Sequence, residues 1–306
     1  MTKVLIATEK PFAAAATDGI RKIIAEAGFE SVFLENYTDP NELLKAVADA
    51  DAMIIRSDKA TRAVIEAAPK LKIIVRAGAG FDNIDLVACT EKGIVAMNTP
   101  GQNSNAVAEL TFGLLVFMAR ANFKGGSGTE LKGKKLGIHA YGNVGRNVAR
   151  IARGFGMEVY AFDPFVTKET IEKDGIIAAD SIEHLYSTCQ YISLNIPATE
   201  KTKKSINFDL LSKMPKGATV INTARKEVID EAGLKQFFEA RPDFKYVSDI
   251  LPDNHAELMQ FENRYFSTPK KQGAETSEAN INAGLAAASQ IVKFITTGDK
   301  TFQVNS

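Results

Sequence analysis

The sequence predicts an α/β protein of two doubly wound domains, each built on a parallel sheet with helices on both faces. Two observations support this prediction. The chain has 306 residues, which is more than one hydrophobic core usually serves. Short β-rich runs alternate with longer helical stretches, and parallel neighbouring strands require the crossover connections that helices supply.

The alternation occurs twice, in two series of predicted strands. The first series is Val4–Thr8, Ala52–Ser57, Lys72–Ala77 and Val95–Asn98. The second series is Lys135–Tyr141, Glu158–Asp163, Tyr191–Ile196, Thr219–Thr223, Tyr246–Ile250 and Tyr265–Ser267. Apolar residues at helical spacing predict a long buried helix over Ser104–Ala121 between the two series.

A glycine-rich linker at Lys124–Gly128 follows that helix, and a last helix is expected over Ser277–Thr296. Domain boundaries are therefore expected near residues 100 and 285. One domain would contain residues 1–99 with 286–306, and the other would contain residues 100–285.

Composition and charge exclude several classes of function. Lys+Arg and Asp+Glu both number 37, so no net charge attracts nucleic acid or an anionic membrane surface. The most apolar run, Leu110–Ala119, is too short to span a bilayer, and no secretory signal opens the sequence. Cys89 and Cys189 lack metal-ligand or redox spacing. We therefore expect two buried thiols, no metal, no membrane or nucleic-acid partner, and a cytoplasmic location.

A dinucleotide-binding fingerprint follows the first strand of the second series. The pattern GxGxxG is filled by Ala140, Tyr141, Gly142, Asn143, Val144 and Gly145. Gly142 would let the backbone approach a pyrophosphate, and Gly145 would let helix and strand pack closely. The N-terminus of the next helix supplies unpaired N–H groups for the phosphates. Ala140 replaces the first glycine, which this turn tolerates if Ala140 keeps a negative φ.

An acidic residue stands where the adenosine ribose of such a cofactor would bind. Asp163 ends the next predicted strand, eighteen residues after Gly145. Its carboxylate would accept hydrogen bonds from the ribose hydroxyls and repel a 2′-phosphate. The sequence therefore predicts NAD, rather than NADP, as the cofactor.

Together with this motif, three longer stretches resemble the D-isomer-specific 2-hydroxyacid dehydrogenase family. They are Ile74–Asp85, Met97–Ser104 with Ala108–Thr111, and Val220–Glu231. The resemblance covers nearly the full length and is greatest to the phosphoglycerate members. It implies a Rossmann cofactor domain inserted in a flavodoxin-like catalytic domain made from both chain ends. It also implies a homodimer formed through the cofactor domains.

The resemblance implies roles for several strand-end residues. Arg225 matches the family's catalytic arginine, whose guanidinium grips the substrate carboxylate and polarises the C2 oxygen. Thr223, at the end of the same strand, is expected among the cofactor-binding residues. The residues that match substrate-binding positions of the phosphoglycerate members are Arg56, Lys59, Arg76 and Gly78. Their cations suit a small, multiply anionic substrate, although Arg56 could instead pair with Asp58.

The proton-transfer histidine of the family is missing. It normally follows a Thr-Pro or Ser-Pro, and here that segment reads Thr268-Pro-Lys-Lys-Gln-Gly273, far from any of the three histidines. Lys270 and Lys271 are the candidates to replace it, as lysine does in one subgroup of the family. Counting forward from Pro269 favours Lys270, and counting backward from Thr276 favours Lys271. Desolvation and repulsion from Arg225 would have to lower the pKa of either lysine.

The carboxylate partner of that histidine is also uncertain in this chain. Asp249 matches the family's strand-end aspartate and is expected among the catalytic residues, but Asn254 stands where a glutamate is expected. A lysine base would not benefit from a nearby carboxylate, which stabilises its protonated form. Asp253 and Glu257 are possible substitutes for the glutamate.

These residues predict NAD-dependent oxidation of 3-phosphoglycerate to 3-phosphohydroxypyruvate by hydride transfer, the entry to serine biosynthesis. A glyoxylate or hydroxypyruvate reductase is a second reading of the same scaffold. A third is an NAD-binding, co-repressor-like scaffold or sensor, in which the histidine is lost with the activity. Retention of Arg225 and of the anion-binding set argues against the third reading.

Overall fold

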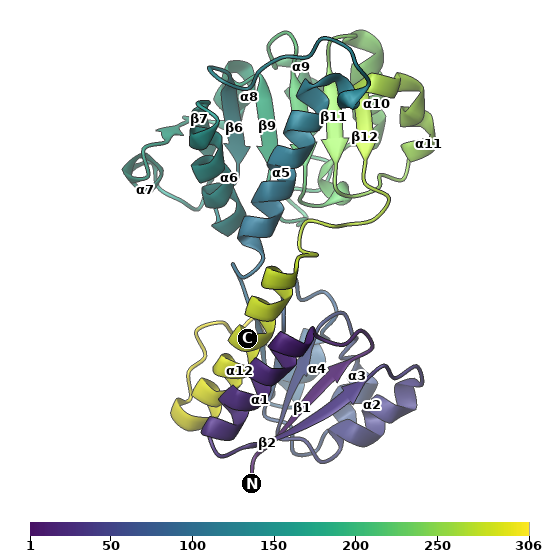
Figure 1. Cartoon of the computed structure of the whole chain (residues 1–306), viewed down its shortest axis with the longest axis vertical. Helices are drawn as coiled ribbons and strands as arrows, with labels where there is room; N and C mark the ends of the chain where they lie inside the picture. Colours follow the sequence, from purple (N-terminus) through teal and green to yellow (C-terminus); the bar gives the residue numbers. More distant parts are fainter. Residues whose placement is uncertain (306) are drawn as a thin grey trace. The chain divides into compact units, whose positions relative to one another are not determined.

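The computed structural model describes residues 1–305, which form two compact units (Figure 1). Unit 1 contains Met1–Asn103 and the chain from Glu275 onward, and unit 2 contains Ser104–Ala274. The expected boundary near residue 285 would cut the last helix, whereas the structure keeps this helix whole in unit 1. The reason is its close packing on the first helix, where a Cβ added to Gly19 would lie 2.3 Å from Leu285 Cδ2.

Unit 1 is built on a five-stranded parallel sheet with the strand order β2-β1-β3-β4-β5. Its strands are β1 (Lys3–Thr8), β2 (Glu30–Glu35), β3 (Ala52–Ile55), β4 (Ile73–Arg76) and β5 (Val95–Asn98). Its helices are α1 (Ala14–Glu26), α2 (Pro40–Val47), α3 (Arg62–Glu66), α4 (Leu86–Glu91) and α12 (Ser277–Thr297).

Both faces of this sheet are buried, as the crossover helices of a parallel sheet require. Alternate residues of β1 show the two layers. Val4 and Ile6 belong to the apolar cluster under α1 and α12, whereas Leu5 and Ala7 belong to the cluster under α2, α3 and α4.

Unit 2 is built on a seven-stranded parallel sheet with the strand order β12-β11-β10-β9-β6-β7-β8. Its strands are β6 (Lys135–His139), β7 (Glu158–Phe162), β8 (Ile177–Ala178), β9 (Tyr191–Leu194), β10 (Thr219–Asn222), β11 (Lys245–Ser248) and β12 (Tyr265–Ser267). Its α-helices are α5 (Ser104–Ala119), α6 (Asn143–Gly154), α7 (Lys168–Lys173), α8 (Ile182–Thr188), α9 (Phe208–Ser212), α10 (Glu231–Ala240) and α11 (His255–Leu258). Its 3₁₀ segments are η1 (Ala121–Phe123), η2 (Lys226–Val228) and η3 (Met259–Arg264).

Two layers of helices cover this second sheet. Helices α5 and α6 lie side by side on one face (Figure 1), where their apolar residues pack on Ile138 of β6 and Ile221 of β10. Helices α8, α9 and α10 cover the other face and pack on Ile192 of β9 and Val220 of β10. The predicted fold class of two doubly wound parallel-sheet domains is confirmed.

The sequence prediction missed two strands, both at sheet edges. Strand β2 carries no fully buried residue, so its sequence lacks the continuous apolar run of a central parallel strand. Strand β8 has two residues. The other ten strands overlap predicted ones, and each carries at least one buried residue.

Each sheet has a point where the strand order reverses, and ligands of open α/β sheets bind outside the carboxyl ends of the strands at such a point. In unit 1 the reversal lies between β1 and β3, and in unit 2 it lies between β6 and β9. The loops that follow these four strands are therefore the first places to look for function.

No helix within residues 1–305 combines the length and apolar character needed to cross a membrane. Over the same range, no three His, Cys, Asp or Glu side chains gather closely enough to hold a metal ion.

Candidate active site

The fingerprint turn joins β6 to α6 at the reversal point of unit 2. A Cβ added to Gly145 would lie 2.4 Å from the Ala140 carbonyl oxygen, so only glycine fits this close approach of helix and turn. A Cβ added to Gly142, the N-cap of α6, would meet nothing within 4 Å. The backbone at Gly142 is therefore open to a phosphate, beside the unpaired N–H groups of the first turn of α6, which begins with Asn143 and Val144.

Ala140 departs from our expectation of a negative φ. Its φ is +77°, in the left-handed region that the first glycine of the fingerprint normally occupies. Alanine in this region costs about 1–2 kcal/mol relative to right-handed backbone. The backbone at Ala140 thus has a conformation that glycine adopts more readily than alanine. A hydrogen bond from the Ala140 N–H to the Phe162 carbonyl holds the chain in this conformation.

Asp163 lies beside the turn, as its predicted role requires. Its Oδ2 accepts a hydrogen bond from Tyr141 N at 2.8 Å, and its Oδ1 accepts one from Phe165 N at 2.8 Å. Each carboxylate oxygen retains a lone pair that could accept a ribose hydroxyl. Nearby, Asn195 follows β9, and its Oδ1 is buried without a partner among residues 1–305, which leaves a further acceptor for a bound ligand. These features fit a dinucleotide.

Tyr141 takes part in this turn through its backbone only. Its ring is buried against α6, its hydroxyl donates to Asp174 Oδ2 at 3.0 Å, and the Arg146 guanidinium lies 4.8 Å from the ring centre. The fingerprint predicts Tyr141 as a cofactor-binding residue, and any contact with a cofactor would come from its main chain because its side chain is engaged with Asp174 and Arg146.

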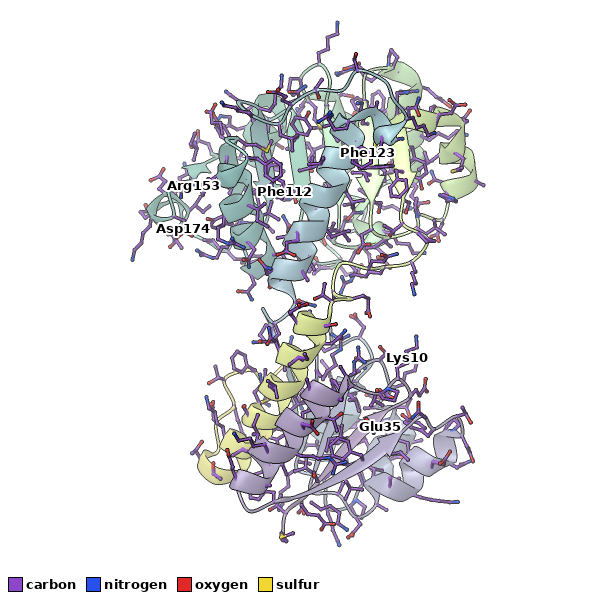
Figure 2. The ribbon with its side chains drawn as sticks, viewed as in Figure 1. Lys10, Glu35, Phe112, Phe123, Arg153 and Asp174 are labelled. Atoms are coloured by element: carbon purple, nitrogen blue, oxygen red, sulfur yellow. The ribbon has the colours of Figure 1, made fainter. Side chains whose placement is uncertain are left out.

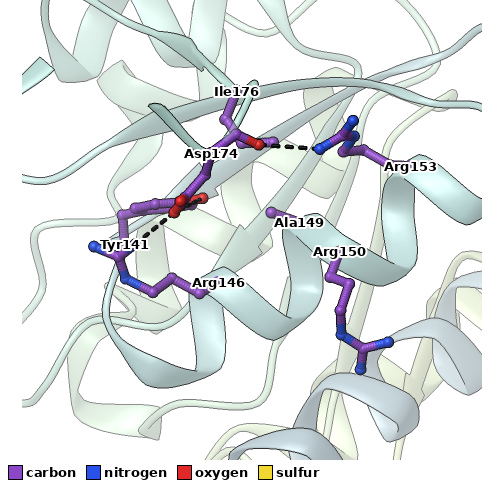
Figure 3. Close-up of a pocket in the computed structure, with 7 residues that line it drawn as sticks. All are labelled: Tyr141, Arg146, Ala149, Arg150, Arg153, Asp174 and Ile176. Atoms are coloured by element: carbon purple, nitrogen blue, oxygen red, sulfur yellow. Dashed lines mark hydrogen bonds and ion pairs between the residues drawn. The ribbon is translucent and has the colours of Figure 1, made fainter. Parts of the chain in front are cut away.

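A shallow hollow beside α6 is lined by Tyr141, Arg146, Ala149, Arg150, Arg153, Asp174 and Ile176 (Figure 3). Its polar groups largely satisfy one another. The Asp174 carboxylate accepts from Arg146 and Tyr141, and the Asp174 carbonyl accepts from Arg153. The bonds from Asp174, which directly follows α7, to Arg146 and Arg153 hold α7 against α6. Only Tyr141 of the lining residues belongs to the fingerprint turn, so we do not assign the active site to this hollow.

His139 is a buried histidine at the end of β6, one residue before the turn. Its Nδ1 lies 3.3 Å from the Tyr186 hydroxyl. Burial lowers the pKa of this imidazole from 6.5 to about 4, against a smaller opposite effect of Asp163. His139 is therefore neutral at physiological pH and packs between the sheet and α8.

The carbonyl of Ala224 brings two predicted site residues together at the end of β10. Arg225 Nη1 donates to this oxygen at 2.9 Å, and Lys271 Nζ donates to it at 3.4 Å. Lys270 makes no hydrogen bond or ion pair with another described residue, and both lysines are exposed, so neither has the desolvation that we expected. Thr223 is buried, with its hydroxyl 3.3 Å from that of Thr111 on α5.

Asp249 is completely buried at the end of β11, beneath the loop that carries the two lysines. Its carboxylate accepts from Gln272 N at 2.9 and 3.1 Å, from Gly273 N at 2.7 Å and from Thr268 Oγ1 at 3.0 Å. All three donors belong to the segment 268–273. The sequence predicts Asp249 among the catalytic residues, and in the structure its carboxylate is an acceptor for the backbone and side chain of this loop.

The possible substitutes for the missing glutamate lie elsewhere. Asp253 pairs with Lys226, and Glu257 pairs with Lys235, both at the surface. The backbone N–H of Asn254 donates to Glu231 Oε2 at 3.0 Å. Asp253 and Glu257 are thus each engaged in an ion pair with a lysine other than Lys270 and Lys271.

In unit 1, Arg56 follows β3 at the reversal point, but its side chain does not pair with Asp58. Arg56 Nη1 donates to the carbonyls of Lys10 (3.2 Å) and Pro11 (3.3 Å), and Nη2 donates to Asn280 Oδ1 at 2.6 Å. The Asp58 carboxylate instead accepts from Glu9 N and from the Tyr37 hydroxyl, both at 2.7 Å. The loops after β1, β2 and β3 are thereby tied together.

Arg76 and Gly78 follow the neighbouring strand β4. Arg76 Nε donates to the Arg56 carbonyl at 3.1 Å, and a Cβ added to Gly78 would lie 1.8 Å from Arg76 Nη1. The guanidinium therefore lies over the glycine backbone. Lys59, in the loop after β3, is exposed. The structure thus gathers all four predicted residues at one edge of the sheet.

Lys10 is a further cation at this edge that sequence reasoning missed. Figure 2 labels it with Glu35, and they lie in the loop after β1 and at the end of β2. Lys10 is exposed, and its carbonyl accepts from Thr8 Oγ1 as well as from Arg56. Its position follows from the strand order, which places β1 beside β3, and the sequence alone does not give that order.

The fold and the fingerprint turn define a two-domain α/β protein with a dinucleotide-binding domain. A family model described as "D-isomer specific 2-hydroxyacid dehydrogenase, NAD binding domain" matches residues 115–269. The chain belongs to the D-isomer specific 2-hydroxyacid dehydrogenase family, and unit 2 carries its NAD-binding domain.

Individual relatives agree with this assignment. A D-3-phosphoglycerate dehydrogenase of Methanocaldococcus jannaschii is 39% identical over 90% of this chain and 55% of its own length. A hydroxypyruvate reductase of Thermotoga maritima is 35% identical over 84% of this chain and 89% of its own. The NAD+-bound 3-phosphoglycerate dehydrogenase of Entamoeba histolytica is similar in structure, with a TM-score of 0.89, 48% identity, and coverage of 100% and 99% of the two chains. The chain spans about half the length of several curated relatives it matches.

Replacing Ala140 with glycine should stabilise the protein. Ala140→Gly removes the left-handed strain, partly offset by the greater freedom of glycine in the unfolded chain, for a net gain of roughly 0.5–1 kcal/mol. Urea unfolding of unit 2 would measure the change. The matched control is Ala149→Gly in the middle of α6, which should destabilise by about 1 kcal/mol. An equal decrease in the free energy of unfolding in both variants would show that Ala140 is not strained.

Stability should fall in acid because of His139. The folded pKa is about 4 and the ordinary value is 6.5, so the unfolded state binds more protons between these pH values. Stability is then complete above pH 6.5 and decreases by up to about 3 kcal/mol as the pH falls towards 4. Unfolding free energies across this range should depend less on pH in His139→Gln. An unchanged pH dependence in that variant would rule out His139 as the source.

Proposed function

We propose that this chain catalyses the NAD-dependent interconversion of 3-phosphoglycerate and 3-phosphohydroxypyruvate. The observation that carries the proposal is the Ala224 carbonyl, which holds the Arg225 guanidinium and the Lys271 ammonium at one point. An anion-orienting group and a proton-transfer group are the two functions that oxidation of a 2-hydroxy acid requires of the protein.

The roles divide between the residues of the two units. Bound NAD supplies hydride acceptance, and donation in the reverse direction, at the C2 carbon of the substrate. Gly142, Asn143, Val144 and Gly145 would hold the pyrophosphate, with Asp163 at the ribose and Thr223 nearby. Arg225 would bind the substrate carboxylate and polarise the C2 oxygen.

Lys271 is the better of the two candidates for the proton transfer at the C2 hydroxyl. Its ammonium contacts the carbonyl beside Arg225, whereas Lys270 has no such contact. The Arg225 guanidinium donates to the same carbonyl, so the two cations share one acceptor. Asp249 would act as a positioning residue that fixes the loop through Gln272 and Gly273.

Unit 1 would supply selectivity for an anionic substrate. Four cationic side chains gather at the carboxyl edge of its sheet, namely Arg56, Arg76, Lys59 and Lys10. The acceptors of Arg56 are neutral, so no carboxylate among them offsets its positive charge. This concentration of cations suits a substrate with both a phosphate and a carboxylate. The similarity to two 3-phosphoglycerate dehydrogenases supports the same choice.

A second candidate function is reduction of hydroxypyruvate, which lacks the phosphate. The observation that favours it is the similarity to the Thermotoga maritima reductase, which is matched over most of its length. The two functions differ in whether Arg56 and its neighbouring cations contribute to catalysis.

We also propose a homodimer formed through unit 2, as the family resemblance implies. The supporting feature is a group of aromatic side chains near α5: Phe112 stacks on the 40% exposed Phe155, and Phe123 is 67% exposed. Figure 2 labels Phe112 and Phe123. Ala121, Asn122 and Phe123 all have positive φ, a strain that persists where surrounding contacts impose it. Sedimentation should give twice the monomer mass, and Phe123→Ser should weaken the association. A wild type that sediments as a monomer at micromolar concentration would contradict this.

The proton-transfer assignment predicts a difference between two neighbouring lysines. With NADH and 3-phosphohydroxypyruvate, Lys271→Ala should lose at least about 100-fold in kcat, because general acid–base groups contribute on this scale. Lys270→Ala is the matched control and should keep most of its kcat. NADH affinity should be unchanged in both variants.

Three other outcomes of these rates are informative. Loss of kcat in Lys270→Ala alone would move the role to Lys270. Equal activity of both variants and the wild type would remove the loop from the chemistry. A wild type that binds NADH but reduces neither 3-phosphohydroxypyruvate nor hydroxypyruvate would contradict both proposed activities.

A further inference from the structure

Asn280 lies in the first turn of α12, in unit 1. The helix begins after Thr276, whose hydroxyl accepts from Ala279 N at 3.1 Å, and the Asn280 N–H donates to the Thr276 carbonyl. The side chain is partly buried, and its Oδ1 accepts from Arg56 Nη2 at 2.6 Å. This contact joins residues 224 positions apart in the sequence.

The acceptors around the Arg56 guanidinium are all neutral. They are the Asn280 amide oxygen and the carbonyls of Lys10 and Pro11, and the Phe12 ring lies 5.1 Å from the guanidinium carbon. The carboxylate of Asp58, two residues along the chain, accepts from Glu9 N, the Tyr37 hydroxyl and the Arg56 backbone N–H, and forms no ion pair with the Arg56 side chain. Arg56 is therefore fixed in place without being neutralised.

The three hydrogen bonds of the Arg56 guanidinium use its terminal nitrogens Nη1 and Nη2. Nε donates to none of residues 1–305 in these bonds, so the Nε side is the free edge of the guanidinium. A guanidinium has five N–H donors, and three acceptors therefore leave at least two N–H groups, the Nε–H among them, for a ligand. A guanidinium binds a carboxylate or a phosphate through two N–H groups in bidentate fashion.

We propose that Asn280 is a positioning residue that aims this free edge of Arg56 at the anionic group of the substrate. The ligand chemistry is a phosphate monoester, and the inference rests on the proposed function. Asn280 need not touch the substrate. Its amide supplies the short, neutral hydrogen bond that orients the guanidinium while leaving its charge for the ligand.

Substitutions at Asn280 should separate orientation from charge. Asn280→Ala removes the acceptor and lets the guanidinium rotate. Asn280→Asp keeps an acceptor at the same place but pairs with Arg56 and neutralises it. Asn282→Ala is the matched control, because Asn282 lies on the same helix, is exposed and makes no side-chain hydrogen bond.

The test is steady-state reduction of 3-phosphohydroxypyruvate and of hydroxypyruvate with NADH. Asn280→Ala should raise the KM for 3-phosphohydroxypyruvate about 10-fold, the loss expected for one charge-assisted hydrogen bond. The KM for NADH, the KM for hydroxypyruvate and kcat should stay near their wild-type values. Asn280→Asp should raise the phosphorylated substrate's KM further, and Asn282→Ala should match the wild type in every parameter.

The outcomes distinguish this inference from the proposed function. If Arg56→Ala raises the KM for 3-phosphohydroxypyruvate and Asn280→Ala does not, the positioning role is overturned while the proposed function stands. Equal increases for both substrates would indicate general damage to unit 1 and would also overturn the role. If the wild type prefers hydroxypyruvate, the proposed function fails. The role of Asn280 is then judged separately, and it stands only if Asn280→Ala and Arg56→Ala both weaken the binding of 3-phosphohydroxypyruvate.

Discussion

The buried carboxylate of Asp249 fixes the loop on which the proposed chemistry depends. A charged group without solvent contact is costly unless hydrogen bonds replace its water, and the segment 268–273 provides three donors. Moving the segment 268–273 away would therefore leave the Asp249 carboxylate either exposed to solvent or buried without hydrogen-bond donors. Lys271 directly precedes two of these donors, Gln272 and Gly273, so the anchor also sets where its side chain begins.

The parallel arrangement of the strands explains how a few residues that are far apart in the sequence can form one site. All strands of each sheet end at the same edge, so side chains distant in sequence meet there. In unit 2 that edge gathers the fingerprint turn, Asp163, Arg225 and the lysine loop. In unit 1 it gathers Arg56 and Arg76, with Lys10 added by the neighbouring strand β1. The catalytic groups and the anion-binding groups thus belong to separate units, each with its own core.

The fold class and several candidate site residues could be predicted from local sequence patterns, because each of these features depends on a short stretch of sequence. The fingerprint, Asp163 and Arg225 each follow a strand that is buried on both faces, and such strands stand out as apolar runs. The edge strand β2 lacks that signal. The sign of φ at Ala140 could not be predicted either, since the glycine conformation is imposed by the bond from its N–H to Phe162 and not by alanine itself.

The contacts between side chains that are distant in the sequence could not be predicted either, because they depend on how the folded elements pack. The choice between Lys270 and Lys271 depends on a contact with Ala224, and the role of Asn280 depends on a contact with Arg56. Asp249 looked like a catalytic aspartate by position, but only the structure shows that its acceptors are taken by the loop. Motifs identify which residues meet at the edge, and packing decides what each one contacts.

Chemical rescue of Lys271→Ala by small primary amines tests the central claim most directly. If Lys271 transfers the proton at C2, added amines should restore turnover of 3-phosphohydroxypyruvate with NADH in a concentration-dependent way. The restored rate should also depend on amine basicity, as general acid–base catalysis requires. A variant that binds NADH normally but shows no rescue with methylamine, ethylamine or propylamine would contradict the account and assign Lys271 a structural or electrostatic role.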